Sequence, residues 1–179
     1  MTASELAASV GFEHFGQLSM DSLVLRKEVR AMCDPEKCTR YARSWSCPPR
    51  VGSLEEIAQR IAPYTEGILV QTEGAMDGPF DMEGIRKANR LHSERFAAFA
   101  RQMKAELGDV FPMGAGSCTI CRKCTYPARP CRHPDRMHPS MEACGLMVAD
   151  VCSASGMKYN YGQDTITFTS LVLYGREDR

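Results

Sequence analysis

The chain is organised around one stretch, Cys118-Thr-Ile-Cys121-Arg-Lys-Cys124-Thr-Tyr-Pro-Ala-Arg-Pro-Cys131. Three thiols recur at every third position, and a fourth follows after a spacer of six residues that contains two prolines. A C-x2-C-x2-C run lets one loop present each sulfur to a different iron of an iron–sulfur cube. Bacterial ferredoxins continue with a three-residue spacer, so the fourth thiol here either closes the same cube or reaches a different one. We interpret this stretch as a [4Fe–4S] binding loop.

Zinc is the alternative occupant of this loop. Zinc sites also use four cysteines, but they usually pair two C-x2-C knuckles from separate segments. His133 and His138 follow the loop and would complete a zinc site, so zinc stays open. A disulfide framework requires an oxidising compartment and fits poorly with nine cysteines, an odd number.

A second cysteine group lies nearer the N-terminus and has the pattern Cys33-x4-Cys38-x8-Cys47. The dipeptide Asp34-Pro35 predicts a turn that folds Cys33 back toward Cys38. Cys47 is followed by two prolines, which cannot join a helix or a central strand, so it occupies a stiff extended corner. Trp45, the only tryptophan, is expected to anchor this loop or to line a pocket. The spacing predicts a second metal site, with ordinary buried thiols as the alternative.

The charge around the first loop is strongly positive. Residues 118–138 contain five Lys or Arg residues and one Asp, a local net charge of plus four in a chain whose net charge is zero. Cations near a cube favour its reduced form and raise its potential. The same patch would dock an acidic redox partner or a small anionic substrate, and a solvated basic loop is the plain alternative.

The number of thiols separates two mechanisms. The set Cys118, Cys121, Cys124 and Cys131 is closed, whereas Cys33, Cys38 and Cys47 leave one iron of a second cube without a protein thiolate. Such an open iron would act as a Lewis acid on a substrate. Two other arrangements stay open: Cys144 closes the second set, or Cys131 serves the N-terminal trio. We expect Cys144 and Cys152 to be small core residues on a helical face.

Length and composition indicate one domain, residues 1–179, able to bury a core of its own. The zero net charge argues against general nucleic-acid binding and against an anionic membrane surface. No apolar run is long enough to cross a bilayer. The start, Met-Thr-Ala-Ser-Glu-Leu, has neither the basic nor the apolar region of a secretion signal, so a cytoplasmic, reducing location is expected.

The hydrophobic pattern predicts an α/β fold in which a central mixed sheet is covered by helices, with a C-terminal β-hairpin and two cysteine-rich metal-binding loops at about 33–49 and 118–138. Ser4 is the expected N-cap of a first helix, and Ser53-Leu-Glu-Glu56 is a capping box. His92 is expected to be an ordinary helix residue and not a ligand. Helices are predicted at 4–10, from 54 to before Pro63, at 85–107 and at 140–155, the last either as one helix or with a break at Gly145. Strands are predicted at 23–25, 67–72 and 110–116, a hairpin at 157–161 and 165–174, and a frayed tail at 175–179.

Two blocks of residues carry a family resemblance. They are Cys33, Cys38, Tyr41 and Trp45-Ser-Cys47-Pro48-Pro49 in the first, and Cys118, Cys121, Cys124, Tyr126-Pro127, Pro130-Cys131-Arg132, Pro134, Pro139-Ser140-Met141-Glu142-Ala143 and Gly145 in the second. Over nearly its whole length the chain resembles a family of uncharacterised cysteine-rich prokaryotic proteins, the predicted metal-binding domain of unknown function DUF2284. The resemblance implies that the seven cysteines of the two blocks are metal ligands, that Cys144 and Cys152 fall outside the ligand pattern, and that the host is anaerobic or strictly reducing.

Three functions follow from these observations. The leading one is a cytoplasmic iron–sulfur protein, with one or two [4Fe–4S] clusters, that carries electrons to or from a partner enzyme in anaerobic metabolism. The second is an enzyme whose three-cysteine cluster binds a small substrate at its open iron. The third is a zinc-stabilised interaction module. The chain has no nucleotide-binding glycine fingerprint, no P-loop and no recognisable Ser-His-Asp arrangement, so no catalytic residue is assigned.

Overall fold

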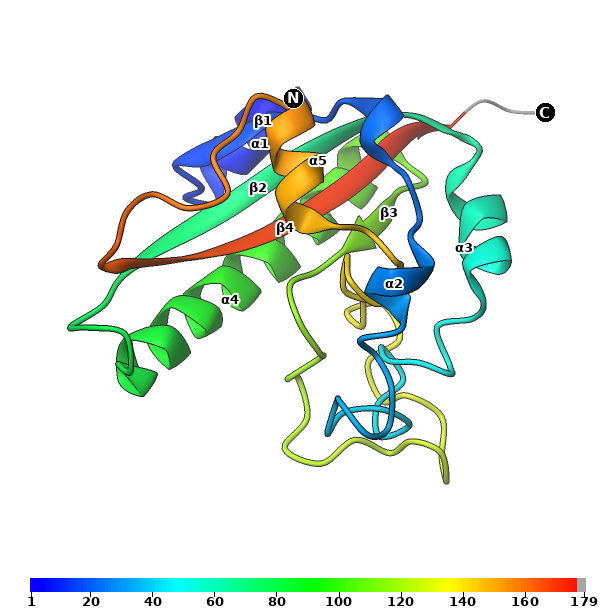
Figure 1. The fold of residues 1–179 in the computed structure, drawn as a ribbon. Coiled ribbons are helices and arrows are strands. Elements are labelled where there is room, and N and C mark those ends of the chain that lie inside the picture. Colours follow the sequence, from blue (N-terminus) through cyan, green and yellow to red (C-terminus); the bar gives the residue numbers. More distant parts are fainter. Residues whose placement is uncertain (177–179) are drawn as a thin grey trace.

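The computed structural model describes residues 1–176, which fold around a four-stranded antiparallel sheet (Figure 1). The strand order is β1-β2-β4-β3. The two long strands, β2 (Tyr64–Ala75) and β4 (Thr165–Arg176), pair along their whole lengths in the middle of the sheet. The shorter strands β1 (His14–Gln17) and β3 (Phe111–Met113) form its edges.

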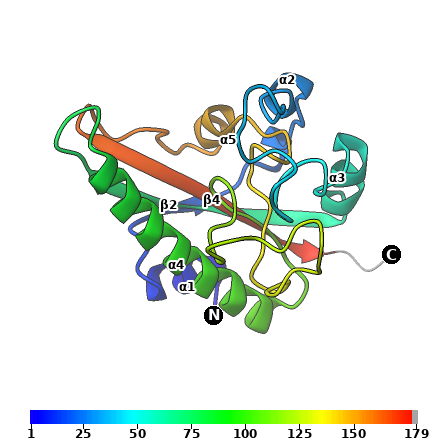
Figure 2. The same ribbon diagram turned by 90° about the horizontal axis from the view of Figure 1, so that it is seen from below.

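Helices cover both faces of this sheet (Figures 1 and 2). One face packs against α1 (Ala3–Ser9) and the long helix α4 (Met82–Leu107). The other face carries α3 (Leu54–Ile61) and α5 (Val148–Ala154). Two shorter elements, the 3-10 helix η1 (Met20–Ser22) and α2 (Lys27–Arg30), precede α3 in the chain.

The core is divided by the alternation of side chains along the central strands. Val70 and Val172 are fully buried on the α1/α4 face, whereas Leu69, Leu171 and Leu173 are fully buried on the other face. Burying each of these side chains contributes about 1.5–3 kcal/mol. The sheet therefore holds two separate apolar layers together.

Local capping chemistry sets the helix boundaries. The capping box of Ser53 and Glu56 is confirmed at the start of α3. The first helix is capped two residues earlier than expected, since Thr2 and not Ser4 forms a capping box, with Glu5. Helix α4 starts three residues before its predicted start, because the Asp81 side chain accepts a hydrogen bond from the Gly84 N–H. It ends at Leu107 as predicted, followed by Gly108 with a positive φ of 81°.

The α/β class is confirmed, but three details of the prediction are wrong. The pairs between the four strands are all antiparallel, so the sheet is not mixed. Residues 23–25 form no strand. The helical stretch predicted at 140–155 is broken at Gly145 (φ 86°), which was one of its two alternatives, and a regular helix begins only at α5. The C-terminal hairpin is absent, since residues 157–161 form no strand.

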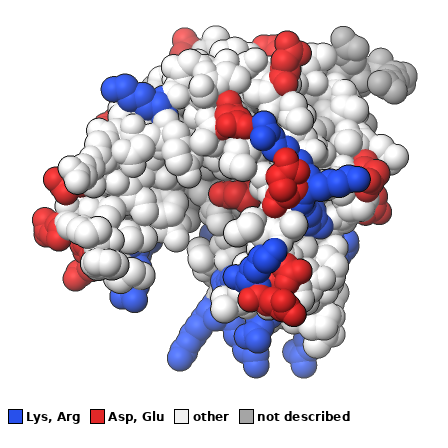
Figure 3. Space-filling view, viewed as in Figure 1, with Lys and Arg blue, Asp and Glu red and all other residues white. Residues whose placement is uncertain are grey.

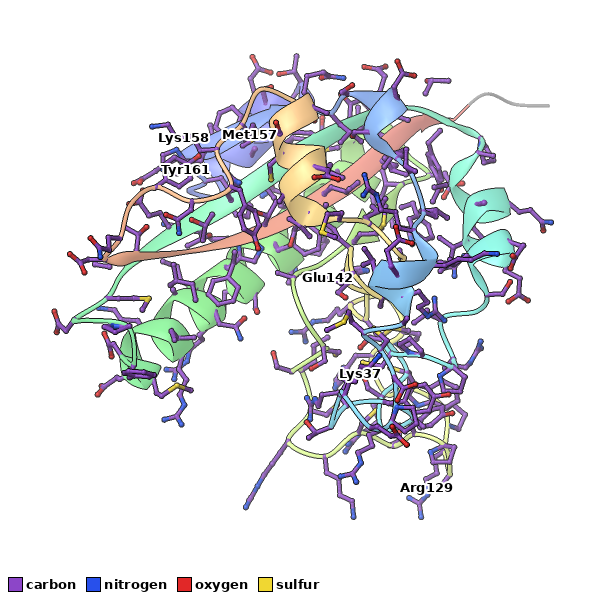
Figure 4. The ribbon with its side chains drawn as sticks, in the orientation of Figure 1. Lys37, Arg129, Glu142, Met157, Lys158 and Tyr161 are labelled. Carbon is purple, nitrogen blue, oxygen red and sulfur yellow. The ribbon has the colours of Figure 1, made fainter. Side chains whose placement is uncertain are left out.

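Residues 157–161 are attached to the sheet by side-chain hydrogen bonds and not by backbone pairing. The segment lies across the α5 side of the sheet, where Figure 4 labels Met157, Lys158 and Tyr161. The buried Gln71 amide donates to the Lys158 carbonyl at 2.8 Å, and the Tyr161 hydroxyl donates to the Gln71 side-chain oxygen at 2.8 Å. The segment is thus held by side chains, and β4 pairs instead with β2 and β3. Of the tail expected to fray, Gly175 and Arg176 continue β4, and residues 177–179 lie outside the described residues.

Both cysteine-containing loops leave the body of the protein on the same side. Residues 33–50 and 118–138 lie next to each other in both ribbon views, and Figure 1 shows them projecting below the sheet (Figures 1 and 2). We call these two segments together the cysteine lobe. Among residues 1–176, no helix combines the length and apolar character that crossing a membrane requires.

Candidate metal centre

Hydrogen bonds and ring contacts join the two segments of the cysteine lobe. The Cys118 N–H donates to the Ser46 hydroxyl at 3.0 Å, and the Trp45 indole N–H donates to the Thr125 hydroxyl at 3.3 Å. The Trp45 and Tyr126 rings meet edge to face, with centroids 5.1 Å apart. The Arg40 side chain donates to the Ser117 hydroxyl at 2.9 Å. Segments more than 70 residues apart in the sequence therefore form one structural unit.

The thiols of Cys118, Cys121, Cys124 and Cys131 line one narrow cavity, together with Ser44, Trp45 and His133. Its volume of about 20 Å³ is close to that needed by one water molecule. A cube is larger, so holding one requires the loop to move outward. Arg122 and Lys123 on this loop are exposed, and the Arg132 guanidinium donates a hydrogen bond to the Lys123 carbonyl.

Backbone N–H groups point at three of these four sulfurs. The His133 N–H donates to Cys131 Sγ at 3.4 Å. Burial raises the pKa of the Cys118 thiol, although the Ile120 N–H acts in the opposite direction. For Cys124, burial also raises the pKa, but donors around the sulfur outweigh it and hold the pKa below its usual value; they are the Tyr126, Trp45 and Thr125 N–H groups and the Ser44 hydroxyl. Such donors stabilise the thiolate, the form that binds metal.

The second set of thiols forms a neighbouring group. Cys33 and Cys38 are half-buried and Cys47 is buried. Burial raises the pKa of Cys33, and the negative charges of Cys38 and Cys47 raise it further. Burial likewise raises the pKa of Cys47, which lies 3.8 Å from the Ser46 hydroxyl. Cys33 also borders an open cavity of about 560 Å³ that is lined by Arg30 and Tyr41.

Four cysteines lie around one cavity, and charge interactions link Cys33 with Cys38 and Cys47. Cys131 lies with the other thiols of its own loop, and not with the N-terminal trio. Cys144 is fully buried in the core, where burial raises the pKa of its thiol to about 12. Cys152 is also fully buried, and its sulfur accepts a hydrogen bond from the Gln71 amide at 3.6 Å. Both are core residues.

The three histidines considered in the sequence occupy different places. His133 lines the cavity of the four thiols, whereas His138 lines a separate cavity beside α4. His92 is only 1% exposed, and both of its ring nitrogens are hydrogen-bonded, to the Thr72 and Ser170 hydroxyls at 3.0 and 2.7 Å. His133 is therefore the histidine that a zinc site at this loop would use.

Sequence reasoning missed Ser44 and Ser46. Both are nearly fully buried, 3% and 1% exposed, and their hydroxyls lie 3.0 Å apart between the two loops. Each serves a cysteine of the other loop, since Ser44 donates to Cys124 and Ser46 accepts from Cys118. The sequence feature that could have indicated them is Ser44-Trp45-Ser46 immediately before Cys47, in which two small hydroxyl residues flank the tryptophan.

The donor set consists mainly of thiols, which both zinc and iron–sulfur clusters take as ligands. Among residues 1–176, no group of three or more His, Cys, Asp or Glu side chains is arranged to hold one metal ion. A zinc ion needs all four ligands within one tetrahedron. A cube binds each thiolate at a different iron, so its four sulfurs stand farther apart. Four cysteines around one cavity supply the number of thiolates that either kind of centre needs.

The cysteine lobe carries a concentrated positive charge. Its two segments contain nine Lys and Arg residues and three Asp and Glu residues, an excess of six positive charges. Because the chain is neutral, the remaining residues carry an excess of six negative charges. Blue side chains gather at the tip of the lobe in Figure 3, and Figure 4 labels one from each segment, Lys37 and Arg129.

One family model matches most of the chain. The family model described as "Predicted metal-binding protein (DUF2284)" matches residues 16–174 of the chain. No curated protein and no solved structure matches. The matched residues include all nine cysteines, and with them both segments of the cysteine lobe. The chain therefore belongs to the DUF2284 family of predicted metal-binding proteins.

Proposed function

We propose that Cys118, Cys121, Cys124 and Cys131 hold a [4Fe–4S] cluster, and that the protein carries electrons to or from a partner enzyme in a reducing, anaerobic cytoplasm. The observation that carries this proposal is the common cavity lined by these four thiols, with backbone N–H groups directed at three of the sulfurs. A bound cluster would supply one-electron transfer. The protein residues would set how readily it takes that electron.

The surroundings favour the more negative, reduced state of such a centre. Each N–H group directed at a sulfur stabilises negative charge there, and the exposed cations of the loop act in the same direction. Trp45 and the buried hydroxyls of Ser44 and Ser46 close the inner side of the loop against water. Arg122, Lys123 and Arg132 remain at the surface around Cys121.

The charge of the lobe indicates the kind of partner. The basic lobe stands on an acidic body, so the molecule has a strong electrical asymmetry. A partner with an acidic surface would be steered toward the lobe and its cysteines, and away from the rest of the molecule. Such steering weakens as salt screens the charges.

A second candidate function rests on the cavity beside Cys33. That cavity, about 560 Å³, is lined by Cys33, Arg30 and Tyr41, so a small molecule could reach this thiol directly. Cys144, the thiol that would close the trio, is fully buried in the core. A cluster held by Cys33, Cys38 and Cys47 would then offer an open iron, and the protein would be an enzyme acting on a small substrate.

The test is metal and sulfide content per chain in protein purified without oxygen. We expect iron and acid-labile sulfide in equal amounts, four of each per cluster. Cys121→Ser should lose the cluster of the four-thiol set, and Cys38→Ser should lose a second cluster if the trio holds one. Cys152→Ala, which removes a thiol outside the lobe, is the matched control and should leave the content unchanged.

Zinc without sulfide would overturn both cluster functions and leave the zinc-stabilised interaction module. If two clusters are present, electron paramagnetic resonance of the reduced protein with added cyanide separates the two candidates. A spectrum that changes on addition of cyanide supports an open iron on the trio, and one that does not change supports electron carriage alone.

A further inference from the structure

A second cavity lies between α4 and the segment that leads from β3 into the cysteine lobe. Its volume is about 460 Å³, within the range of small-molecule sites. Residues 114–120 form one wall and the lobe-facing side of α4 forms the other. The surface in Figure 3 is hollowed between the lobe and the α4 side of the molecule. The cavity shares Cys118 with the candidate metal centre, but its other walls are different.

Positive charge surrounds this cavity on two sides. Arg86 and Arg90 lie one helical turn apart on α4, and Arg136 approaches from the opposite wall. Glu94 is the one acid among the described residues that line it. The three guanidinium groups are exposed, so they remain hydrated and free to bind an incoming group. Arginine in this position favours planar or tetrahedral oxyanions, which it binds with paired N–H donors.

The interior of the cavity is aromatic and apolar. The rings of His92 and Phe96 are parallel within 3°, with centroids 6.2 Å apart, and the His138 ring meets Phe96 edge to face at 5.9 Å. Both nitrogens of His92 are occupied by hydroxyl groups, and burial lowers its pKa to about 3, so it adds no charge at neutral pH. Burial also lowers the pKa of His138, to about 4.

Small residues keep the cavity open. Ala97 lines it from α4, and Gly114, Ala115 and Gly116 line it from the opposite wall. A Cβ built on Gly116 would meet no atom within 4 Å, so the space beside this residue is not filled by the protein. The cavity thus combines an arginine rim with an uncharged aromatic interior, an arrangement suited to a molecule with one charged and one apolar end.

We propose that this cavity binds a small organic anion, with its carboxylate or phosphate group held by Arg86, Arg90 and Arg136 and its apolar body against Phe96 and Ala97. Since Cys118 lies in the same wall, the bound molecule would sit next to the candidate metal centre. Anion binding needs only the cavity residues. A change in the properties of the metal centre on anion binding would require, in addition, that the proposed function is correct.

The test is isothermal titration calorimetry of the whole chain, purified without oxygen, with four probes. Phenyl phosphate and benzoate carry both an anionic group and an aromatic body, and the stronger of the two identifies the preferred oxyanion. Inorganic phosphate lacks the body, and benzyl alcohol lacks the charge. We expect at least one of the two aromatic anions to bind at one site per chain, inorganic phosphate to bind more weakly, and benzyl alcohol not to bind.

Variants locate the site. Arg90→Gln and Arg86→Gln should each weaken binding roughly tenfold, the loss of a charge-assisted hydrogen bond. Arg101→Gln is the matched control, since Arg101 is exposed on the same helix but lies outside the cavity, and it should leave the affinity unchanged. Ala97→Phe should abolish binding by filling the cavity without changing its charge.

The proposal is overturned if neither aromatic anion binds, if benzyl alcohol binds as well as benzoate, or if Arg101→Gln weakens binding as much as Arg90→Gln. The last result would indicate a general charge effect. A separate readout tests the link to the metal centre, namely a change of its absorption spectrum on addition of the anion. If the protein purified without oxygen contains no iron but still binds the anion in an Arg90-dependent way, the anion site stands and the cluster function is overturned.

Discussion

The Ser46 hydroxyl accepts a hydrogen bond from the backbone N–H of Cys118 at 3.0 Å, across 72 residues of sequence. Ser46 is 1% exposed and precedes Cys47. The bond therefore joins the segment 33–50 directly to Cys118, the first cysteine of the segment 118–138. The same hydroxyl lies 3.0 Å from Ser44 and 3.8 Å from Cys47 Sγ. One buried oxygen thus organises the contact between the two candidate sites.

Replacing this oxygen tests its role. Ser46→Ala leaves the Cys118 N–H without its partner, and an unsatisfied donor of this kind costs about 1–3 kcal/mol. We expect faster loss of metal from the protein to a chelator, and a lower free energy of unfolding in urea. Ser22→Ala, which removes a local hydrogen bond in η1, is the control. Equal metal release from both variants would show that the bond between the loops does not hold the centre.

The single tryptophan reports on the loop next to it. Trp45 lines the cavity of the four thiols, and its indole N–H is bonded to Thr125. An iron–sulfur cluster in this cavity would lie next to the indole and would absorb light at the wavelengths of its emission. A zinc ion does not absorb at those wavelengths. We expect tryptophan fluorescence to fall when iron and sulfide are added to metal-free protein, and to stay nearly unchanged with zinc. The decrease should disappear in Cys124→Ser. Quenching that survives in that variant would place the cluster elsewhere.

Cys144 separates a core thiol from a ligand. It is fully buried among apolar residues, and its pKa is raised to about 12, so it stays protonated. Cys144→Ala should lower the free energy of unfolding by about 1–2 kcal/mol, the effect of a small cavity, and should leave the metal content unchanged. Cys47→Ala, also at a buried thiol, should lose metal if the trio holds a cluster. Loss of one cluster in Cys144→Ala would make Cys144 the fourth ligand of the trio.

His92 makes stability depend on pH. Burial lowers its pKa from 6.5 to about 3, so in this range the unfolded chain binds a proton that the folded protein does not. The contribution of His92 is complete above pH 6.5 and is lost as the pH falls toward 3. At pH 4.5 the loss is on the order of 2–3 kcal/mol, since each pKa unit corresponds to about 1.4 kcal/mol. His138, with a pKa lowered to about 4, acts in the same direction.

Urea unfolding of the wild type and of His92→Gln at pH 7.0, 5.5 and 4.5 measures this effect. The wild type should lose more stability than the variant as the pH falls, and any contribution of the metal centre cancels in the difference. Parallel curves for the two proteins would show that His92 takes up a proton in the folded state. The double variant His92→Gln, His138→Gln should have the flattest dependence.

Local chemistry made several features predictable. The capping box of Ser53 and Glu56 and the end of α4 before Gly108 depend on residues within a few positions of one another, so both could be located without a fold. The spacing of the seven cysteines likewise predicted a group of four and a group of three. The alternation at 157–161 misled the hairpin prediction, because this segment is held to β2 through the Gln71 side chain and not by backbone pairing.

What the sequence settles alone is local: the capping box at Ser53, the end of α4 before Gly108 and the spacing of the cysteines, because these follow from the identities of near neighbours. Only the tertiary structure decided that β4 lies between β2 and β3, that Ser46 meets Cys118, and that α4 and residues 114–120 enclose a cavity. The residues that meet in each of these three features are far apart in the chain, and no periodic pattern in the sequence marks them. Packing of the whole sheet brings them together, and local propensity carries no information about that.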